Sequence, residues 1–184
     1  MLKIIYTKLN ISSVSPREQH DAEHFAAYAL LKKGLEQLGL PPMKVLYTEN
    51  GKPYFEGDSI YFSLSHTRGI AVCAISDAPV GVDIEEIRPK KIESIKRIAA
   101  RMFAEREQKH LEACNYGLSD FYEIWVRKEA MVKRSGIGIK GMIDADSCSP
   151  EVLSAKLGDY VLAVCKNPPE SFDPEEVSDL IPLK

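Results

Sequence analysis

The segment Val80-Gly81-Val82-Asp83-Ile84-Glu85 combines the pattern of a β-strand with two acidic groups. Alternate side chains of a strand point to opposite faces, so the three apolar residues share one face. Asp83 and Glu85 share the other face with Gly81, and their Cα atoms are expected roughly 6.5–7 Å apart. Two carboxylates at that separation can bind one hard cation, and Gly81 leaves room for a ligand to approach. The alternative is an ordinary strand with a solvated acidic face.

A second segment, Trp125-Val126-Arg127-Lys128-Glu129-Ala130-Met131-Val132-Lys133, lies in a stretch with helical periodicity. Apolar residues recur along one side of this stretch, at Leu118, Phe121, Tyr122, Trp125 and Val132. Glu129 follows Trp125 by four residues and Lys133 follows Glu129 by four, so both lie beside the apolar stripe. This pattern predicts a cleft in which Glu129 faces a metal ion or a proton and Lys133 faces a phosphate. The alternative is a surface ion pair that contributes about 0.2–0.5 kcal/mol.

Length and composition restrict the class of protein. The chain has 184 residues, 45% of them hydrophobic and 28% charged, as in folded domains that bury a core. A net charge of -3 without a long basic tract argues against a nucleic-acid partner. There is no apolar run long enough for a membrane span, and Met1–Thr7 is too short and too quickly polar for a signal peptide. Four cysteines without a C-x-x-C pair disfavour a zinc cluster and fit a reduced, cytoplasmic setting.

Hydrophobic periodicity predicts an α+β protein. The expected helices cover residues 17–38, 92–102, 105–113 and 118–134. The expected strands cover residues 1–7, 43–47, 60–65, 70–75, 80–85, 152–157 and 160–166, and an acidic, proline-rich tail with one short terminal helix follows. The order of a helix with strands, repeated once, divides the chain into an N-terminal half, residues 1–80, and a C-terminal half, residues 81–184. The C-terminal half carries the metal and catalytic motifs.

Two further places carry groups that can face a phosphate. Ser65 and His66 close a predicted strand, where His66 is expected at the exit of the sheet, and a turn histidine without a ligand is the alternative. Lys52, in the turn Asn50-Gly51-Lys52-Pro53, can point at a phosphate or only form the turn. There is no G-x-x-x-x-G-K-[ST] and no G-x-G-x-x-G, which argues against P-loop and Rossmann nucleotide sites.

The order of these motifs is more specific than any one of them. It resembles the 4'-phosphopantetheinyl transferases, of the longer type that primes peptide synthetase and fatty acid carrier proteins, over about Gly51 to Ile139. The motifs in question are Gly51-Lys52-Pro53, Phe62 to His66, Gly81 to Glu85, Phe103 with Glu107, and Trp125 to Lys133. The resemblance implies transfer of phosphopantetheine from coenzyme A to a serine of a carrier protein, with release of adenosine 3',5'-bisphosphate. It also implies a pseudo-dimer of two similar halves, each a helix packed on a small, mainly antiparallel sheet.

The resemblance also implies a set of site residues. By role, they are Asp83, Glu85 and Glu129 for Mg²⁺; Lys133 and Lys128 for the cofactor; Ser65 and His66 for the phosphates of its nucleotide end; Lys52 at the border of the same pocket; and Glu107 in support. Mg²⁺ prefers oxygen ligands, which agrees with three carboxylates. A carboxylate beside the metal can take the proton of an alcohol nucleophile, so we expect Glu129 and Lys133 to be the catalytic residues.

One segment departs from the family pattern. Where many members have D-x-x-R, this chain has Asp21-Ala22-Glu23-His24, which leaves Arg17 and His24 as candidates to bind the 3'-phosphate of coenzyme A.

A basic group between the two halves is a candidate docking surface. An acidic carrier protein is expected to dock there, with a merely solvated helix face as the alternative. The group consists of Lys90, Lys91, Lys96, Arg97 and Arg101.

Two other functions fit the same acids: a metal-dependent phosphohydrolase of nucleotides, and a non-catalytic coenzyme A-binding protein. We expect a monomer, with no membrane and no nucleic acid among its partners.

Overall fold

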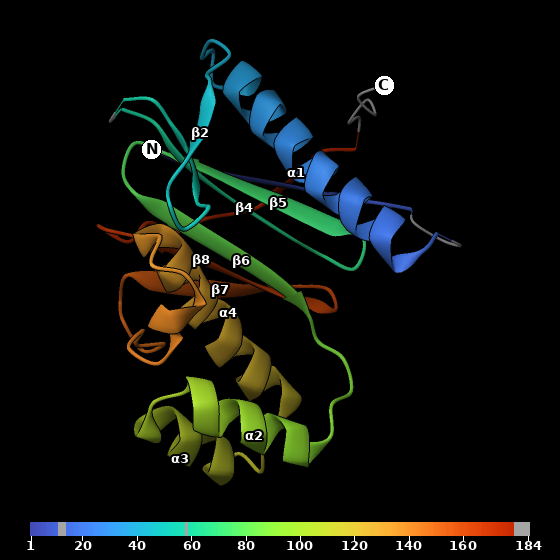
Figure 1. Cartoon of the computed structure of the whole chain (residues 1–184), viewed down its shortest axis with the longest axis vertical. Coiled ribbons are helices and arrows are strands. Elements are labelled where there is room, and N and C mark those ends of the chain that lie inside the picture. The colour runs from blue at the N-terminus through green and yellow to red at the C-terminus, as the bar shows by residue number, and fades with distance from the viewer. Residues whose placement is uncertain (11–13, 58, 179–184) are drawn as a thin grey trace.

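The computed structural model describes residues 1–10, 14–57 and 59–178, which form layers in the order helix, sheet, sheet, helix (Figure 1). Its elements are β1 (Leu2–Lys8), α1 (Pro16–Gln37), β2 (Val45–Tyr47), β3 (Pro53–Phe55), β4 (Tyr61–Thr67), β5 (Ile70–Ser76), β6 (Val80–Glu86), α2 (Ile92–Met102), α3 (Glu105–Ala113), α4 (Leu118–Ser135), the 3-10 turn η1 (Ile139–Met142), β7 (Val152–Leu157), β8 (Tyr160–Lys166) and β9 (Glu175–Glu176). The mixed α+β class is confirmed, and the predicted helices agree with the observed ones to within one residue.

The first sheet has the order β4-β5-β1-β9, with α1 packed on its outer face. Helix α1 begins at a capping box, in which Ser15 bonds the backbone of Glu18 and the Glu18 side chain bonds back. Arg68 and Gly69 both have positive φ angles, 38° and 83°, as a two-residue hairpin turn between β4 and β5 requires. His66 therefore lies inside β4, which corrects its predicted position in the turn.

The second sheet has the order β6-β8-β7, and helix α4 covers its outer face. The core beneath α4 also includes residues of α2 and α3, and Figure 1 shows these two helices beside the N-terminal part of α4. Trp125 packs there against Phe103 and Phe121, with ring centroids 6.4 and 6.3 Å away, and so acts as a core residue.

A third core lies between the two sheets, which face each other through their inner sides. The alternation predicted for residues 80–85 explains this core, because its three apolar side chains all point inward. From the first sheet the core takes Ile4, Tyr6, Ile70, Val72 and Ala74, and from the second Val80, Val82, Ile84, Leu162 and Val164.

The edge strands β4 and β6 meet through side-chain hydroxyl groups. The backbone N–H of Val82 donates to Ser63 Oγ at 3.0 Å, and that of Ile84 donates to Ser65 Oγ at 3.4 Å. The serines thus satisfy the open edge of β6, which would otherwise bury unpaired donors. This seam holds β4 beside the acidic residues of β6.

Gly81 serves a different purpose from the one that the sequence suggested. A Cβ atom at this position would lie 1.9 Å from the carbonyl oxygen of Ala130 and 2.5 Å from the backbone nitrogen of Arg134. The missing side chain makes room for the backbone of α4, not for a ligand. The close approach brings the C-terminal half of α4 onto β6.

Two segments differ from the expectation. Strand β3 was not predicted, because its three residues follow a turn motif and pair only with β2. In the described part of the tail, β9 pairs in parallel with β1, so the chain returns to the first sheet. The short terminal helix was expected at the end of the chain, where residues 179–184 lie outside the part that the structure describes. Among the described helices, none is long and apolar enough to cross a membrane.

Candidate active site

A pocket of about 260 Å³ gathers most of the segments that the sequence singled out. Glu129 and Lys133 line it from α4, Lys52 from the turn before β3, and Ser63 and Leu64 from β4. Because these residues come from both halves of the chain, the pocket exists only when the two halves are packed together.

Asp83 lies beside this pocket in a network of charged hydrogen bonds. Lys133 Nζ donates to Asp83 Oδ1 at 2.6 Å and to Ser65 Oγ at 2.8 Å. Ser65 Oγ in turn donates to Asp83 Oδ1 at 2.8 Å. The Asp83 side chain is only 7% exposed, whereas Lys133 is 31% exposed. The lysine therefore holds the buried carboxylate on one side and reaches solvent on the other.

The second oxygen of Asp83 has no partner among the described residues. Asp83 Oδ2 is buried and makes no hydrogen bond, which is costly for a carboxylate oxygen. A hard cation is a suitable partner, because it binds carboxylate oxygens directly. The buried, unpaired oxygen of Asp83 therefore fits a site for Mg²⁺.

Two further carboxyl groups lie close to Asp83 and feel its charge. Burial raises the pKa of Glu129 to about 7, with Asp83 and Glu85 adding to the rise and Lys133 opposing it. Burial and Asp83 also raise the pKa of Glu85, whose carboxylate accepts a hydrogen bond from Thr67 Oγ1 at 3.3 Å. A divalent cation would relieve the cost of ionising Glu85 and Glu129 beside Asp83.

The chain is similar to known proteins over most of its length. The model of the 4'-phosphopantetheinyl transferase superfamily matches residues 79–169. The 4'-phosphopantetheinyl transferase AcpT of Salmonella typhi is 33% identical over 171 residues, which cover 89% of this chain and 86% of the relative. AcpT of Escherichia coli strain K12 is 30% identical over 96% of both chains. This chain belongs to the 4'-phosphopantetheinyl transferase superfamily. Sfp of Bacillus subtilis strain 168 is 30% identical over 118 residues, which cover 60% of this chain and 49% of Sfp.

In this phosphopantetheinyl transferase, Lys52 borders the pocket and also caps α4. Its Nζ donates to the carbonyl oxygen of Arg134 at 2.5 Å, and Asn50 Nδ2 donates to the carbonyl of Gly136 at 3.1 Å. Burial and the nearby Arg134 lower the pKa of Lys52. A cation at a helix C-terminus is favourable, so the turn holds the C-terminal end of α4 in place.

His66 faces α1. Two of its neighbours there, Glu23 and His20, were not among the site residues expected from the sequence. Glu23, which is 4% exposed, accepts from the backbone N–H of Gly69 at 2.6 Å and lies 3.3 Å from His66 Nδ1. The ring centroids of His20 and His24 lie 5.1 and 5.9 Å from that of His66. Burial lowers the pKa of His66, and the contact with Glu23 opposes this effect. The i,i+4 spacing of His20 and His24 was the signal that could have found the group.

The structure corrects the expectation that Lys128 binds the cofactor. Its side chain is 0% exposed, and Nζ donates to Glu107 Oε2 at 2.6 Å and to the carbonyl of Ala145 at 2.5 Å. Glu107 also accepts from the backbone N–H of Ser147 at 3.0 Å. The pair is a buried support for α4, because i and i+1 on a helix face different sides. Lys128 therefore points into the core while Glu129 points into the pocket.

Proposed function

We propose that this protein transfers the 4'-phosphopantetheine group from coenzyme A to a serine hydroxyl of an apo carrier protein, as a holo-[acyl-carrier-protein] synthase. Adenosine 3',5'-bisphosphate is the second product. The observation that carries the proposal is the proximity of four charged groups in a chain of this superfamily: Glu129 and Lys133 line one pocket, Lys133 pairs with Asp83, and Glu85 interacts electrostatically with both Asp83 and Glu129.

Asp83, Glu85 and Glu129 would hold the Mg²⁺ ion, with Asp83 Oδ2 as the ligand atom that lacks any other partner in the described residues. Bound Mg²⁺ neutralises charge on the pyrophosphate of coenzyme A. Lys133 adds a positive charge at the exposed side of the same network, where a phosphate oxygen can bind its ammonium group.

Glu129 acts as the general base in this proposal. The pKa of about 7 describes Glu129 in the metal-free protein. Mg²⁺ bound beside it would favour the ionised carboxylate, which is the form that accepts a proton. The proton of the carrier serine passes to Glu129, directly or through a water molecule. The serine oxygen forms a bond to the phosphorus on the pantetheine side. The bond from that phosphorus to the bridging oxygen breaks, and its electron pair leaves with adenosine 3',5'-bisphosphate.

The nucleotide end of coenzyme A is assigned to the residues between α1 and β4. Ser65 and His66 contact its phosphates in this proposal, and His24 is the candidate for the 3'-phosphate, since its ring lies beside that of His66. Arg17 remains a second candidate at the exposed start of α1. Lys52 lines the pocket beside Glu129 and Lys133 and is proposed to border the bound cofactor.

The two halves of the chain form a pseudo-dimer in this proposal, with residues 1–80 and 81–184 as similar units. In support, each half packs one long helix, α1 or α4, on an antiparallel group of strands. The protein is proposed to act as a monomer in the cytoplasm.

An acidic carrier protein is proposed to dock on α2. Lys96, Arg97 and Arg101 are exposed along this helix, whereas Lys90 lies 5.7 Å from the ring of Phe121. Lys96 also rests on the ring of Tyr116, at 4.7 Å. Arg97 and Arg101 are therefore exposed cations of α2 that are available to meet a partner.

Incubation with coenzyme A, Mg²⁺ and apo carrier proteins, followed by mass spectrometry of the carrier, tests the proposal. We expect a carrier heavier by one phosphopantetheine group, and a loss of at least about 100-fold in rate for Glu129→Gln and Asp83→Ala. Glu123→Gln, which changes an exposed acid of the same helix, is the matched control. Release of phosphopantetheine without carrier would instead identify a phosphohydrolase. Wild-type rates in both folded site variants would overturn the assignment.

A further inference from the structure

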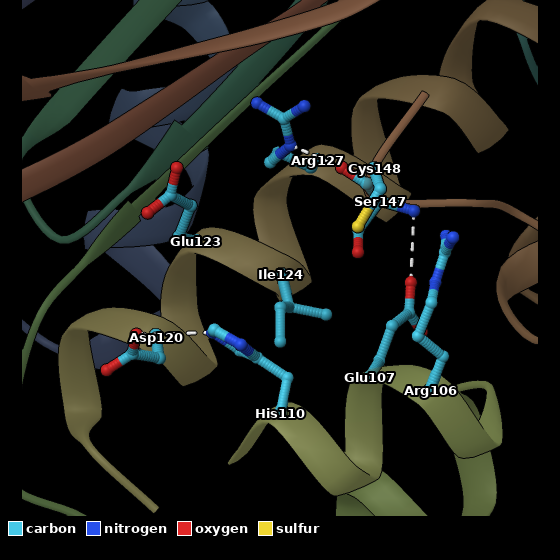
Figure 2. Close-up of a pocket in the computed structure, with 9 residues that line it drawn as sticks. All are labelled: Arg106, Glu107, His110, Asp120, Glu123, Ile124, Arg127, Ser147 and Cys148. Atoms are coloured by element: carbon cyan, nitrogen blue, oxygen red, sulfur yellow. Dashed lines mark hydrogen bonds and ion pairs between the residues drawn. The ribbon is translucent and has the colours of Figure 1, made fainter. Parts of the chain in front are cut away.

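A second group of side chains lies outside the transfer pocket, where α3 meets α4. Figure 2 shows the imidazole of His110 directed at the carboxylate of Asp120. His110 Nε2 lies 3.5 Å from Asp120 Oδ1 and 3.8 Å from Cys114 Sγ. One nitrogen, one sulfur and one oxygen thus lie within 4.8 Å of one another.

The turn between the two helices positions this group. His110 and Cys114 are four residues apart at the end of α3, so they lie on one face. Asn115 and Tyr116 both have left-handed backbones, with φ angles of 51° and 57°, which reverses the chain within three residues. A Cβ atom at the next residue, Gly117, would lie 2.6 Å from Asp120 Oδ2. The turn therefore places the first turn of α4 against the last turn of α3.

The neighbouring charges are already engaged elsewhere. His110 and Asp120 line a pocket of about 540 Å³, which Arg106 and Arg127 also line. Arg106 pairs with Asp146, and Arg127 donates to the carbonyl of Ser147 at 2.5 Å. In contrast, the side-chain contacts that His110, Cys114 and Asp120 make among the described residues are with one another.

We infer that a Zn²⁺ ion binds between His110, Cys114 and Asp120. Imidazole nitrogen, thiolate sulfur and carboxylate oxygen are the three ligand types that zinc takes in proteins. Tetrahedral coordination at the usual bond lengths separates such atoms by roughly 3.3–3.6 Å. The observed 3.5 and 3.8 Å differ from this by a few tenths of an ångström or less.

The fourth position is left to water. The adjoining pocket and the 55% exposure of the His110 side chain provide the space. The thiol of Cys114 must release its proton when the ion binds.

This site differs in chemistry from the transfer pocket and does not depend on the proposed function. Mg²⁺ prefers the all-oxygen set around Asp83, while a borderline ion such as Zn²⁺ prefers nitrogen and sulfur. The missing C-x-x-C pair disfavoured a zinc cluster, but a three-residue site built across a turn does not need that pair. The bound ion joins α3 to α4, the helix that carries Glu129.

Titration of the full chain with Co²⁺, after treatment with a chelator, tests the inference. Cobalt in a thiolate site gives a charge-transfer absorption in the near ultraviolet, and Zn²⁺ should remove it by displacement. We expect one equivalent to bind. Cys114→Ser and His110→Ala should each weaken binding by at least about 100-fold, the upper range seen when only a supporting hydrogen bond is lost.

Two control variants locate the ion. Cys148→Ser removes the exposed cysteine of the same pocket, and Asp83→Ala removes an acid of the transfer pocket; both should keep the absorption. Circular dichroism shows that each variant is folded, and Zn²⁺ should raise the melting temperature of the wild type but not of His110→Ala. Absence of the band in the wild type, its persistence in Cys114→Ser, or its loss in either control would overturn the inference.

Discussion

Glu129 occupies a position where burial and two neighbouring acids act in the same direction. Each favours the protonated carboxyl group, and Lys133 offsets them only in part, so the pKa reaches about 7. The same group that could accept a proton near neutral pH is therefore a cost to the stability of the metal-free fold.

Glu129→Gln should make the metal-free protein more stable above pH 7. In the unfolded chain the Glu129 carboxyl group has a pKa of about 4.3, whereas in the folded protein its pKa is about 7. Between these two pH values the folded state therefore binds more protons than the unfolded state. Stability of the wild type consequently falls as pH rises through that window, and the glutamine variant escapes the loss. Urea unfolding with a chelator, at several pH values from about 5 to 8, measures the difference. Glu123→Gln, which removes an exposed acid of the same helix, is the control, and an effect of Glu129→Gln that is independent of pH would contradict the prediction.

Lys128→Met should destabilise the fold without weakening the binding of coenzyme A. Removing the lysine leaves the Glu107 carboxylate buried without its cation, which costs about 3–5 kcal/mol. Burial raises the pKa of Glu107, but the hydrogen bonds from Lys128 and Ser147 outweigh this effect and hold the pKa below its ordinary value. Urea unfolding gives the cost, and the KM for coenzyme A, measured where the variant is folded, should match the wild type. A large rise in that KM would restore Lys128 as a cofactor contact.

At the scale of elements, the contact of α4 with β6 fixes the site. The two backbones approach closely because position 81 has no side chain. This contact sets Glu129 and Lys133 of α4 against the carboxylate of Asp83 on β6.

Gly81→Ala should displace α4 and lower both stability and transfer rate. The added Cβ atom would overlap the backbone of Ala130, which cannot move aside as a side chain can, so the cost should reach or exceed about 1–3 kcal/mol. Gly39→Ala is the control. A Cβ atom added at this position would have no atom within 4 Å, so only the left-handed backbone makes alanine unfavourable there, by about 1–2 kcal/mol. Thermal unfolding and transfer rates compare the two. Normal transfer in a folded Gly81→Ala protein would contradict this account of α4.

Charge reversal on α2 should weaken the use of an acidic carrier protein. The double variant Arg97→Glu and Arg101→Glu should raise the KM for the carrier about tenfold, because steering by charge is lost, and should leave the KM for coenzyme A unchanged. Lys32→Glu with Lys44→Glu makes the same charge change on exposed residues of the first half. Steady-state kinetics at low and high salt measure both. Equal effects of the two double variants would remove α2 as the docking surface.

At the scale of the whole molecule, the two halves depend on each other. Their sheets share an apolar core, hydroxyl groups of β4 satisfy the edge of β6, and β9 of the tail pairs with β1. Either half alone would expose an apolar sheet face.

Unfolding should therefore occur in one transition. We expect the curves from circular dichroism and from the fluorescence of Trp125, which lies in the second half, to coincide in urea. Separately expressed fragments 1–80 and 81–184 should not fold, because each would leave its side of the shared core exposed to water. Two resolved transitions, or a folded fragment, would show that the halves are independent domains.

The sequence by itself predicted the helices and all strands except β3 and β9, together with the charged residues proposed for the site. Alternation placed Asp83 and Glu85 on one face of β6, and helical spacing placed Glu129 and Lys133 together, because these relations depend only on local geometry. The motif order also indicated the family that the comparisons show.

Only the tertiary structure decided which groups meet. It packed Gly81 against α4, buried Lys128 beside Glu107, put His66 within β4 beside His24, and brought His110 and Cys114 to Asp120. The reason is physical: such contacts depend on how helices and sheets pack and on the exact turn between them, and a periodic pattern in one segment carries no information on its distant partner.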